Sequence, residues 1–91
     1  KAGLIGLTRS LAKTFSQDGI TCNAVSPGLV ATEMTAAELA TPAGLEKARQ
    51  IPAGRIGTAG EIAAAVAYLV GPGSDYISGQ TINVNGGMYF G

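Results

Sequence analysis

The stretch Asn23-Ala-Val-Ser-Pro-Gly-Leu-Val-Ala-Thr32 decides the fold, because a run with strand character passes directly into a Pro-Gly turn. The predicted strand begins near Ile20. Pro27 fixes φ and removes a backbone donor, and Gly28 lets another molecule approach the main chain closely. In an open parallel α/β sheet, ligands bind outside the carboxyl ends of the strands. The turn is therefore expected to border a ligand site, provided that helices flank the strand.

The residues before this stretch have the spacing of an amphipathic helix. Their apolar positions recur at intervals of three and four residues, and polar side chains occupy the other side. Asp18-Gly19 ends the predicted helix, because Gly19 suits the left-handed conformation that commonly follows a helix C-terminus. The face expected to pack on the sheet consists of Leu4, Thr8, Leu11, Ala12 and Phe15.

A second helix and a second strand are predicted further along the chain. Thr58-Ala-Gly-Glu61 has the pattern of a capping box, in which the two outer side chains each bond an otherwise unpaired amide. The helix behind it ends at Gly71-Pro72-Gly73, and residues 79–85 then alternate as a strand. The apolar face of this helix is expected to be Ile62, Val66, Leu69 and Val70.

Residues 33–57 interrupt this regular pattern and resemble two short helices. An insertion that follows the carboxyl end of a strand is well placed to cover a ligand. We therefore predict that residues 33–57 form a substrate-binding lid. Its apolar underside would consist of Leu29, Met34, Leu39, Leu45 and Ile51, although anchoring to the core explains each of them equally well.

The order helix, strand, helical lid, helix, strand predicts an α/β fold, as the tail of a doubly wound parallel sheet. So few elements cannot cover two parallel strands on both faces and pair both of their edges. The chain also starts in mid-pattern, with Lys1 instead of Met. We therefore expect residues 1–91 to be the C-terminal segment of a single larger domain.

Composition argues against several classes of function. Six basic and six acidic residues cancel, and no basic patch with interleaved aromatic residues favours nucleic acid as a partner. No apolar run has the length of a membrane span. The sequence has no histidine and one cysteine, Cys22, so no metal site is expected, and Cys22 is predicted to be a small buried hydrophobe. No signal peptide is visible, and the cytoplasm is the default expectation.

Five further sequence segments occur in order along nearly the whole chain. They are Lys1-Ala-Gly-Leu-Ile-Gly-Leu-Thr-Arg-Ser-Leu-Ala12, Asn23-Ala-Val-Ser-Pro-Gly28 with Thr32-Glu-Met34, Arg55-Ile-Gly57 with Glu61-Ile-Ala63, Ile77-Ser-Gly-Gln-Thr81, and Val84-Asn-Gly-Gly-Met88. Together they resemble the C-terminal third of a short-chain dehydrogenase/reductase and are most similar to bacterial 3-oxoacyl-(acyl carrier protein) reductases. The resemblance implies the C-terminal portion of a Rossmann-type sheet, whose N-terminal dinucleotide-binding part lies outside this sequence. It also implies an enzyme that interconverts a carbonyl and a secondary alcohol with NADP or NAD, with a 3-oxoacyl thioester as substrate.

The resemblance gives Lys1 a catalytic role. Lys1 matches the lysine of a Tyr-x-x-x-Lys pair whose tyrosine precedes this sequence. A cation beside a phenol lowers the pKa of the phenol, so that the tyrosine exchanges a proton with the substrate oxygen near neutral pH. The lysine of the family also hydrogen-bonds the ribose of the cofactor. Without the other segments, Lys1 would be interpreted as a solvated helix lysine.

The Pro-Gly turn resembles the family's cradle for nicotinamide. The resemblance implies that the Val30 backbone bonds the carboxamide and that the Thr32 hydroxyl lies near the carboxamide and the pyrophosphate. Holding the carboxamide sets which face of the ring meets the substrate. The residues implied in cofactor binding are Lys1, Pro27, Gly28, Val30 and Thr32, and those implied in substrate contact are Leu29 and Met34.

The glycine-rich turn, serine and tyrosine that the family requires have no counterpart here, so the isolated segment is expected to be inactive. The choice between NADP and NAD stays open, because the discriminating residue belongs to an earlier strand. The alternative is a non-catalytic oligomerisation or binding segment of a dehydrogenase-like protein. The apolar residues Met88, Tyr89 and Phe90 are consistent with such a contact, and the resemblance implies a homotetramer.

Overall fold

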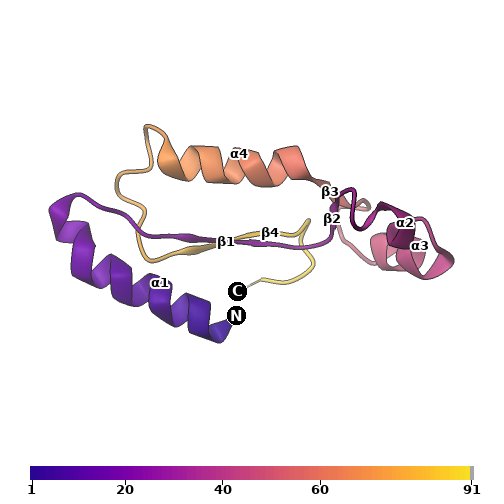
Figure 1. Ribbon diagram of the computed structural model, residues 1–91, viewed down its shortest axis with the longest axis horizontal. Coiled ribbons are helices and arrows are strands. Elements are labelled where there is room, and N and C mark those ends of the chain that lie inside the picture. Colours follow the sequence, from indigo (N-terminus) through magenta and orange to yellow (C-terminus); the bar gives the residue numbers. More distant parts are fainter. Residues whose placement is uncertain (91) are drawn as a thin grey trace.

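The computed structural model describes residues 1–90 and shows helices alternating with short parallel strands (Figure 1). This order confirms the predicted α/β fold. The helices and strands are α1 (Ala2–Phe15), the 3-10 turn η1 (Ser16–Asp18), β1 (Ala24–Pro27), β2 (Val30–Ala31), α2 (Ala36–Leu39), α3 (Pro42–Arg49), β3 (Gly57–Thr58), α4 (Ala59–Val70) and β4 (Thr81–Val84).

Two small parallel ladders organise the chain. β1 pairs with β4, so that Ala24 lies opposite Thr81 and Pro27 opposite Val84. The second ladder joins β2 to β3 beyond the carboxyl end of β1. In Figure 1, α4 runs along one side of the β1–β4 pair and α1 along the other, and both helices contact β1. This layering is what right-handed crossovers between parallel strands produce.

The first helix packs through its small residues. Thr8 and Ala12 are buried, whereas Leu4 is 56% exposed and Leu11 and Phe15 are also exposed. The predicted packing face is therefore only partly correct, because its small residues are buried and its large apolar ones are exposed. The predicted end is confirmed, since a 3-10 turn follows α1 and Gly19 adopts a φ of 80°.

Strand β1, which leads into the Pro27–Gly28 turn, is shorter than predicted. It begins at Ala24 instead of Ile20, because the preceding residues bond the loop before β4. Gly79 donates its amide to the Cys22 carbonyl at 2.7 Å. The Asn23 side chain donates to the Ile77 carbonyl and accepts from the amide of residue 80. Cys22 is only half-buried, which corrects the expectation of a buried thiol.

The lid contains two short helices, α2 and α3, as predicted. The Thr41 hydroxyl caps α3 by accepting the amide of residue 44 at 3.2 Å. After α3, Ile51 is 4% exposed, and the amide of Ala53 donates to the Gly86 carbonyl at 3.0 Å. Ile51 therefore anchors the return segment of the lid to the loop after β4. By contrast, Leu45 is exposed and takes no part in an apolar underside.

The described residues bury little apolar surface. Their radius of gyration is 15.4 Å, compared with about 12 Å for a compact domain of this length. Val66 and Val70 on α4 are exposed, which corrects the predicted face of that helix. The buried apolar residues are Ala12, Ala24 and Ile51. Within residues 1–90, no helix combines the length and the apolarity needed to cross a membrane.

Candidate functional site

A pocket of about 250 Å³ lies between the Pro27–Val30 turn and the lid. The turn contributes the carboxyl end of β1 and the start of β2, and the lid contributes residues from α2, α3 and the segments before them. Pro27, Gly28, Leu29, Val30, Thr35, Leu39, Ala43 and Lys47 are among its lining residues. The structure thus brings the Pro27–Val30 turn, where a ligand was predicted, next to residues 33–57, the predicted lid. In the sequence these two segments are separated by the end of β2.

Thr35 is a pocket residue that the sequence analysis did not identify. Its hydroxyl donates to the Val30 carbonyl at 3.1 Å and accepts the amide of Thr32 at 3.0 Å. The Thr32 and Thr35 hydroxyl oxygens lie 3.0 Å apart. Thr35 therefore ties the end of β2 to the start of the lid. The i, i+3 spacing of the two threonines was the available signal, because such hydroxyls commonly bond nearby main chain in turns.

Gly28 is required by a contact within the chain. A Cβ on Gly28 would lie 2.7 Å from Cβ and 2.9 Å from Cα of Asn85, which follows β4. The Gly28 amide also donates to the Val84 carbonyl at 2.9 Å. Asn85 therefore occupies the space beside the Gly28 Cα atom, where a ligand was predicted to approach the main chain closely. The contact with Asn85 was not predicted, because the two residues are far apart in sequence.

The Tyr89 side chain lies between Lys1 and the Pro27–Val30 turn. Its Nζ atom is 4.9 Å from the centroid of the Tyr89 ring, a cation–π geometry. Tyr89 in turn lines, with Pro27 and Gly28, a neighbouring pocket of about 260 Å³. Figure 1 shows the two termini close together, near the β1–β4 pair. Of the predicted contact residues, Met34 is 94% exposed and does not line the pocket under the lid.

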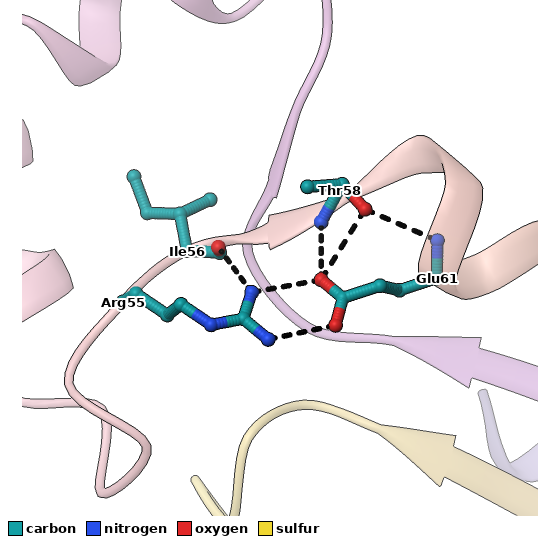
Figure 2. A network of polar contacts seen from close by, with 4 residues as sticks. All are labelled: Arg55, Ile56, Thr58 and Glu61. Carbon is teal, nitrogen blue, oxygen red and sulfur yellow. Dashed lines mark hydrogen bonds and ion pairs between the residues drawn. The ribbon is translucent and has the colours of Figure 1, made fainter.

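An ion-pair network stands at the start of α4 (Figure 2). Glu61 accepts two hydrogen bonds from the Arg55 guanidinium, at 2.8 Å on Oε1 and 2.7 Å on Oε2. Its Oε1 also accepts the Thr58 amide at 3.0 Å, while the Thr58 hydroxyl accepts the Glu61 amide at 3.1 Å. The predicted capping box is confirmed. The arginine that joins it was not predicted.

The network lowers the pKa of Glu61 from its ordinary 4.5 to about 2, first through the Arg55 hydrogen bonds and then through the Thr58 amide. A depressed carboxyl pKa stabilises the fold above pH 4.5, and this contribution is lost as the pH falls toward 2. We expect carbon NMR of the Glu61 carboxyl to show a titration midpoint near 2, and Arg55→Met to move it toward 4.5. Arg49→Met, on α3, is the control. An unchanged midpoint in Arg55→Met would contradict the assignment.

The pocket has the wall composition of a small ligand site. Its wall combines apolar side chains, such as Leu29 and Leu39, with main chain at the end of a strand and the Thr35 hydroxyl. Its volume is slightly below the roughly 300 Å³ of the smallest sites for drug-sized molecules. A cavity of this volume is too small to enclose a whole dinucleotide.

Comparison with known proteins identifies similar sequences over the whole chain. A family described as enoyl-(acyl carrier protein) reductase matches residues 1–89. The 3-oxoacyl-(acyl carrier protein) reductase FabG of Salmonella typhimurium is 51% identical over 98% of this chain, and that of Staphylococcus aureus is 48% identical. The chain covers 36% of each of these relatives, so it spans about a third of their length.

Solved structures show the same arrangement of elements. A short-chain dehydrogenase/reductase from Serratia marcescens superposes with a TM-score of 0.88 and 39% identity, over 97% of this chain and 35% of its own. An NADP-bound structure from Agrobacterium tumefaciens, provisionally named a 2-deoxy-d-gluconate 3-dehydrogenase, gives the same TM-score and identity over 96% of this chain and 36% of its own. The two parallel ladders and the helices around them are therefore a known arrangement within larger Rossmann-fold chains.

Proposed function

This chain belongs to the short-chain dehydrogenase/reductase family, and we propose that it supplies the nicotinamide and substrate side of an NAD(P)-dependent oxidoreductase. The observation that carries the proposal is the pocket between the carboxyl end of β1 and the lid. In open α/β sheets, ligands bind at this end of the strands. Residues 1–91 would form the C-terminal segment of the catalytic domain, with residues 33–57 as its lid.

We propose that the residues around the turn hold the nicotinamide end of the cofactor. Val30 would hold the carboxamide through its backbone, and the Thr32 hydroxyl would add a contact beside it. Pro27 and Gly28 would form the floor of this cradle, since both line the pocket. The bound nucleotide, NADP or NAD, supplies the hydride. The NADP in the Agrobacterium tumefaciens structure supports a nicotinamide nucleotide as the ligand.

Lys1 is our candidate for the catalytic cation of this segment. Its ammonium would hydrogen-bond the ribose and lower the pKa of a neighbouring phenol, which then exchanges a proton with the substrate oxygen. The position of Lys1 beside Tyr89, which borders the turn, supports this role. The isolated segment contains no counterpart of that phenol, so we expect residues 1–91 alone to be inactive.

We propose a 3-oxoacyl thioester as the substrate. The curated relatives are named 3-oxoacyl reductases, whereas the matching family is described as an enoyl reductase. The two reactions differ in the bond that is reduced, C=O or C=C. Leu29 lines the pocket and would contact the acyl chain, while Met34 would reach the substrate only when the lid closes over it.

The test is a nicotinamide absorbance assay on the protein translated from the complete gene. We expect acetoacetyl thioester to oxidise NADPH or NADH, and crotonyl thioester to leave it unchanged. Turnover of crotonyl thioester alone would overturn the carbonyl substrate but not the cofactor. No oxidation with any 3-oxoacyl thioester, simple ketone or enoyl thioester would overturn the proposed activity.

A non-catalytic assembly role is the second candidate, because α1 exposes a row of large apolar side chains, Leu4, Leu7 and Leu11. Exposed apolar rows of this kind mark interfaces. With either function we propose that the whole protein is a homotetramer. If sedimentation shows a tetramer that neither binds nicotinamide nucleotides nor reduces carbonyl compounds, the assembly role is favoured.

A further inference from the structure

We propose that Arg55, Thr58 and Glu61 act as positioning residues, which hold β3 against β2 and thereby place the Val30 main chain for the nicotinamide end of the cofactor. This inference rests on the proposed function, because it assigns a ligand to the Val30 cradle. We call the three residues the β3 clamp. None of them lines the pocket under the lid, whereas Arg55 and Glu61 line a smaller cavity of about 70 Å³ that also borders Leu29. We assign the three residues a role through the main chain around β3, because they are hydrogen-bonded to it.

The cradle depends on a very short ladder. β2 and β3 pair over only two residues each, with Val30 opposite Gly57 and Ala31 opposite Thr58. The Gly57 amide donates to the Leu29 carbonyl at 3.0 Å. An isolated two-stranded ribbon is marginally stable even when it is longer. The position of the Val30 main chain therefore depends on β3 as well as on the Thr35 hydroxyl, which donates to the Val30 carbonyl.

The β3 clamp forms hydrogen bonds with the main chain on both sides of Gly57. Before the strand, the Arg55 guanidinium donates to the Ile56 carbonyl at 3.3 Å and to both oxygens of Glu61. Within it, the Thr58 amide and hydroxyl donate to Glu61 Oε1 at 3.0 and 3.2 Å. Figure 2 shows the carboxylate bridging the two sides. Glu61, on the first turn of α4, thus fixes the residues on either side of Gly57, whose amide donates to the Leu29 carbonyl.

Capping alone does not account for the arginine. A capping box needs only the threonine and the glutamate, whereas Arg55 adds two parallel bonds from the other end of β3. The Arg55 and Glu61 side chains are 60% and 42% exposed. Exposed ion pairs add little to global stability, but a two-pronged guanidinium–carboxylate pair has a well-defined geometry. We therefore expect loss of the arginine to change the cradle more than the overall stability.

Arg55→Met in the protein translated from the complete gene tests the clamp, because it removes the guanidinium and leaves the Thr58–Glu61 capping box in place. Two dissociation constants are measured by titration calorimetry: that of the reduced cofactor (NADPH or NADH, whichever binds) and that of ADP-ribose or its 2'-phosphate, which lack nicotinamide. We expect cofactor binding to weaken roughly five- to tenfold, within the usual range for residues that act at a distance. Binding of the nicotinamide-free compound should stay unchanged.

Two further variants make the result specific. Arg49→Met removes the guanidinium of the exposed Arg49–Glu46 pair, which lies 3.7 Å apart on α3, and should leave both constants unchanged. Arg55→Lys keeps the charge but loses the two-pronged geometry, so it should weaken cofactor binding by less than Arg55→Met. It also serves if Arg55→Met fails to fold.

Each other result overturns the clamp. Equal weakening of both compounds would show a general structural role, and unchanged cofactor binding would show that β3 needs no arginine. If the unmodified protein binds neither compound, the proposed function fails and the clamp fails with it. That result is distinguishable, because it appears before any substitution is made.

Discussion

Replacing Lys1 by methionine is expected to lower kcat/KM for carbonyl reduction by roughly a hundred- to ten-thousandfold, the usual contribution of a positioned group in proton transfer. The physical reason is the loss of the cation that would hold the ribose and favour the phenolate. Methionine keeps the length and the apolar stem of the side chain, so α1 should remain intact. Steady-state kinetics of the protein translated from the complete gene measure the effect.

Lys13→Met is the matched control, because Lys13 is an exposed lysine in the last turn of the same helix. Its substitution should change kcat/KM less than twofold, as surface substitutions usually have small effects. If Lys1→Met retains the activity of the unmodified protein, Lys1 has no catalytic role and its contact with Tyr89 is purely structural.

Gly28→Ala is expected to destabilise the fold by about 1–3 kcal/mol or more, the cost of overpacking a well-packed site. The new Cβ would lie 2.7 Å from Cβ and 2.9 Å from Cα of Asn85. Because the second of these atoms is main chain, relief requires the loop after β4 to move. The shift of the urea unfolding midpoint, at unchanged slope, measures the destabilisation.

Two comparisons isolate the contact with Asn85. Gly60→Ala on α4 meets nothing closer than the Thr58 hydroxyl at 3.8 Å, so it should not destabilise the protein. Asn85→Gly removes the Cβ clash, leaves the Cα clash and also loses the hydrogen bonds of Asn85 with Tyr89 and Gly87. Measured in the Asn85→Gly background, Gly28→Ala should therefore cost less than in the unmodified protein, but not zero. Full stability of Gly28→Ala would show that the loop after β4 yields freely.

Local chemistry explains which predictions succeeded. The capping box of α4 was predictable because Thr58 and Glu61 lie three residues apart and bond each other's amides. The left-handed Gly19 and the two short lid helices follow likewise from short-range preferences. Family resemblance, carried by the order of five segments, supplied the Rossmann-type fold that the structural neighbours share.

Contacts between distant segments account for what was missed. Strand β1 starts at Ala24 because Asn23 bonds residues near position 80. Helix α1 buries Thr8 and Ala12 and leaves its large apolar side chains exposed. Neither feature is visible in the local pattern. Thr35 is a different case, because it was missed although its spacing from Thr32 is a local signal.

The turn from Pro27 to Thr32 shows which properties follow from the local sequence and which require tertiary contacts. Its place at the carboxyl end of a parallel strand, before two short helices, follows from residue order and backbone preferences alone, because these are local properties of the chain. Which atoms occupy its surroundings was decided by tertiary structure: Asn85 against Gly28, Thr35 on the Val30 carbonyl, and the Arg55–Glu61 pair behind β3. Steric exclusion and hydrogen bonding act between atoms that folding brings together, whatever their separation in sequence.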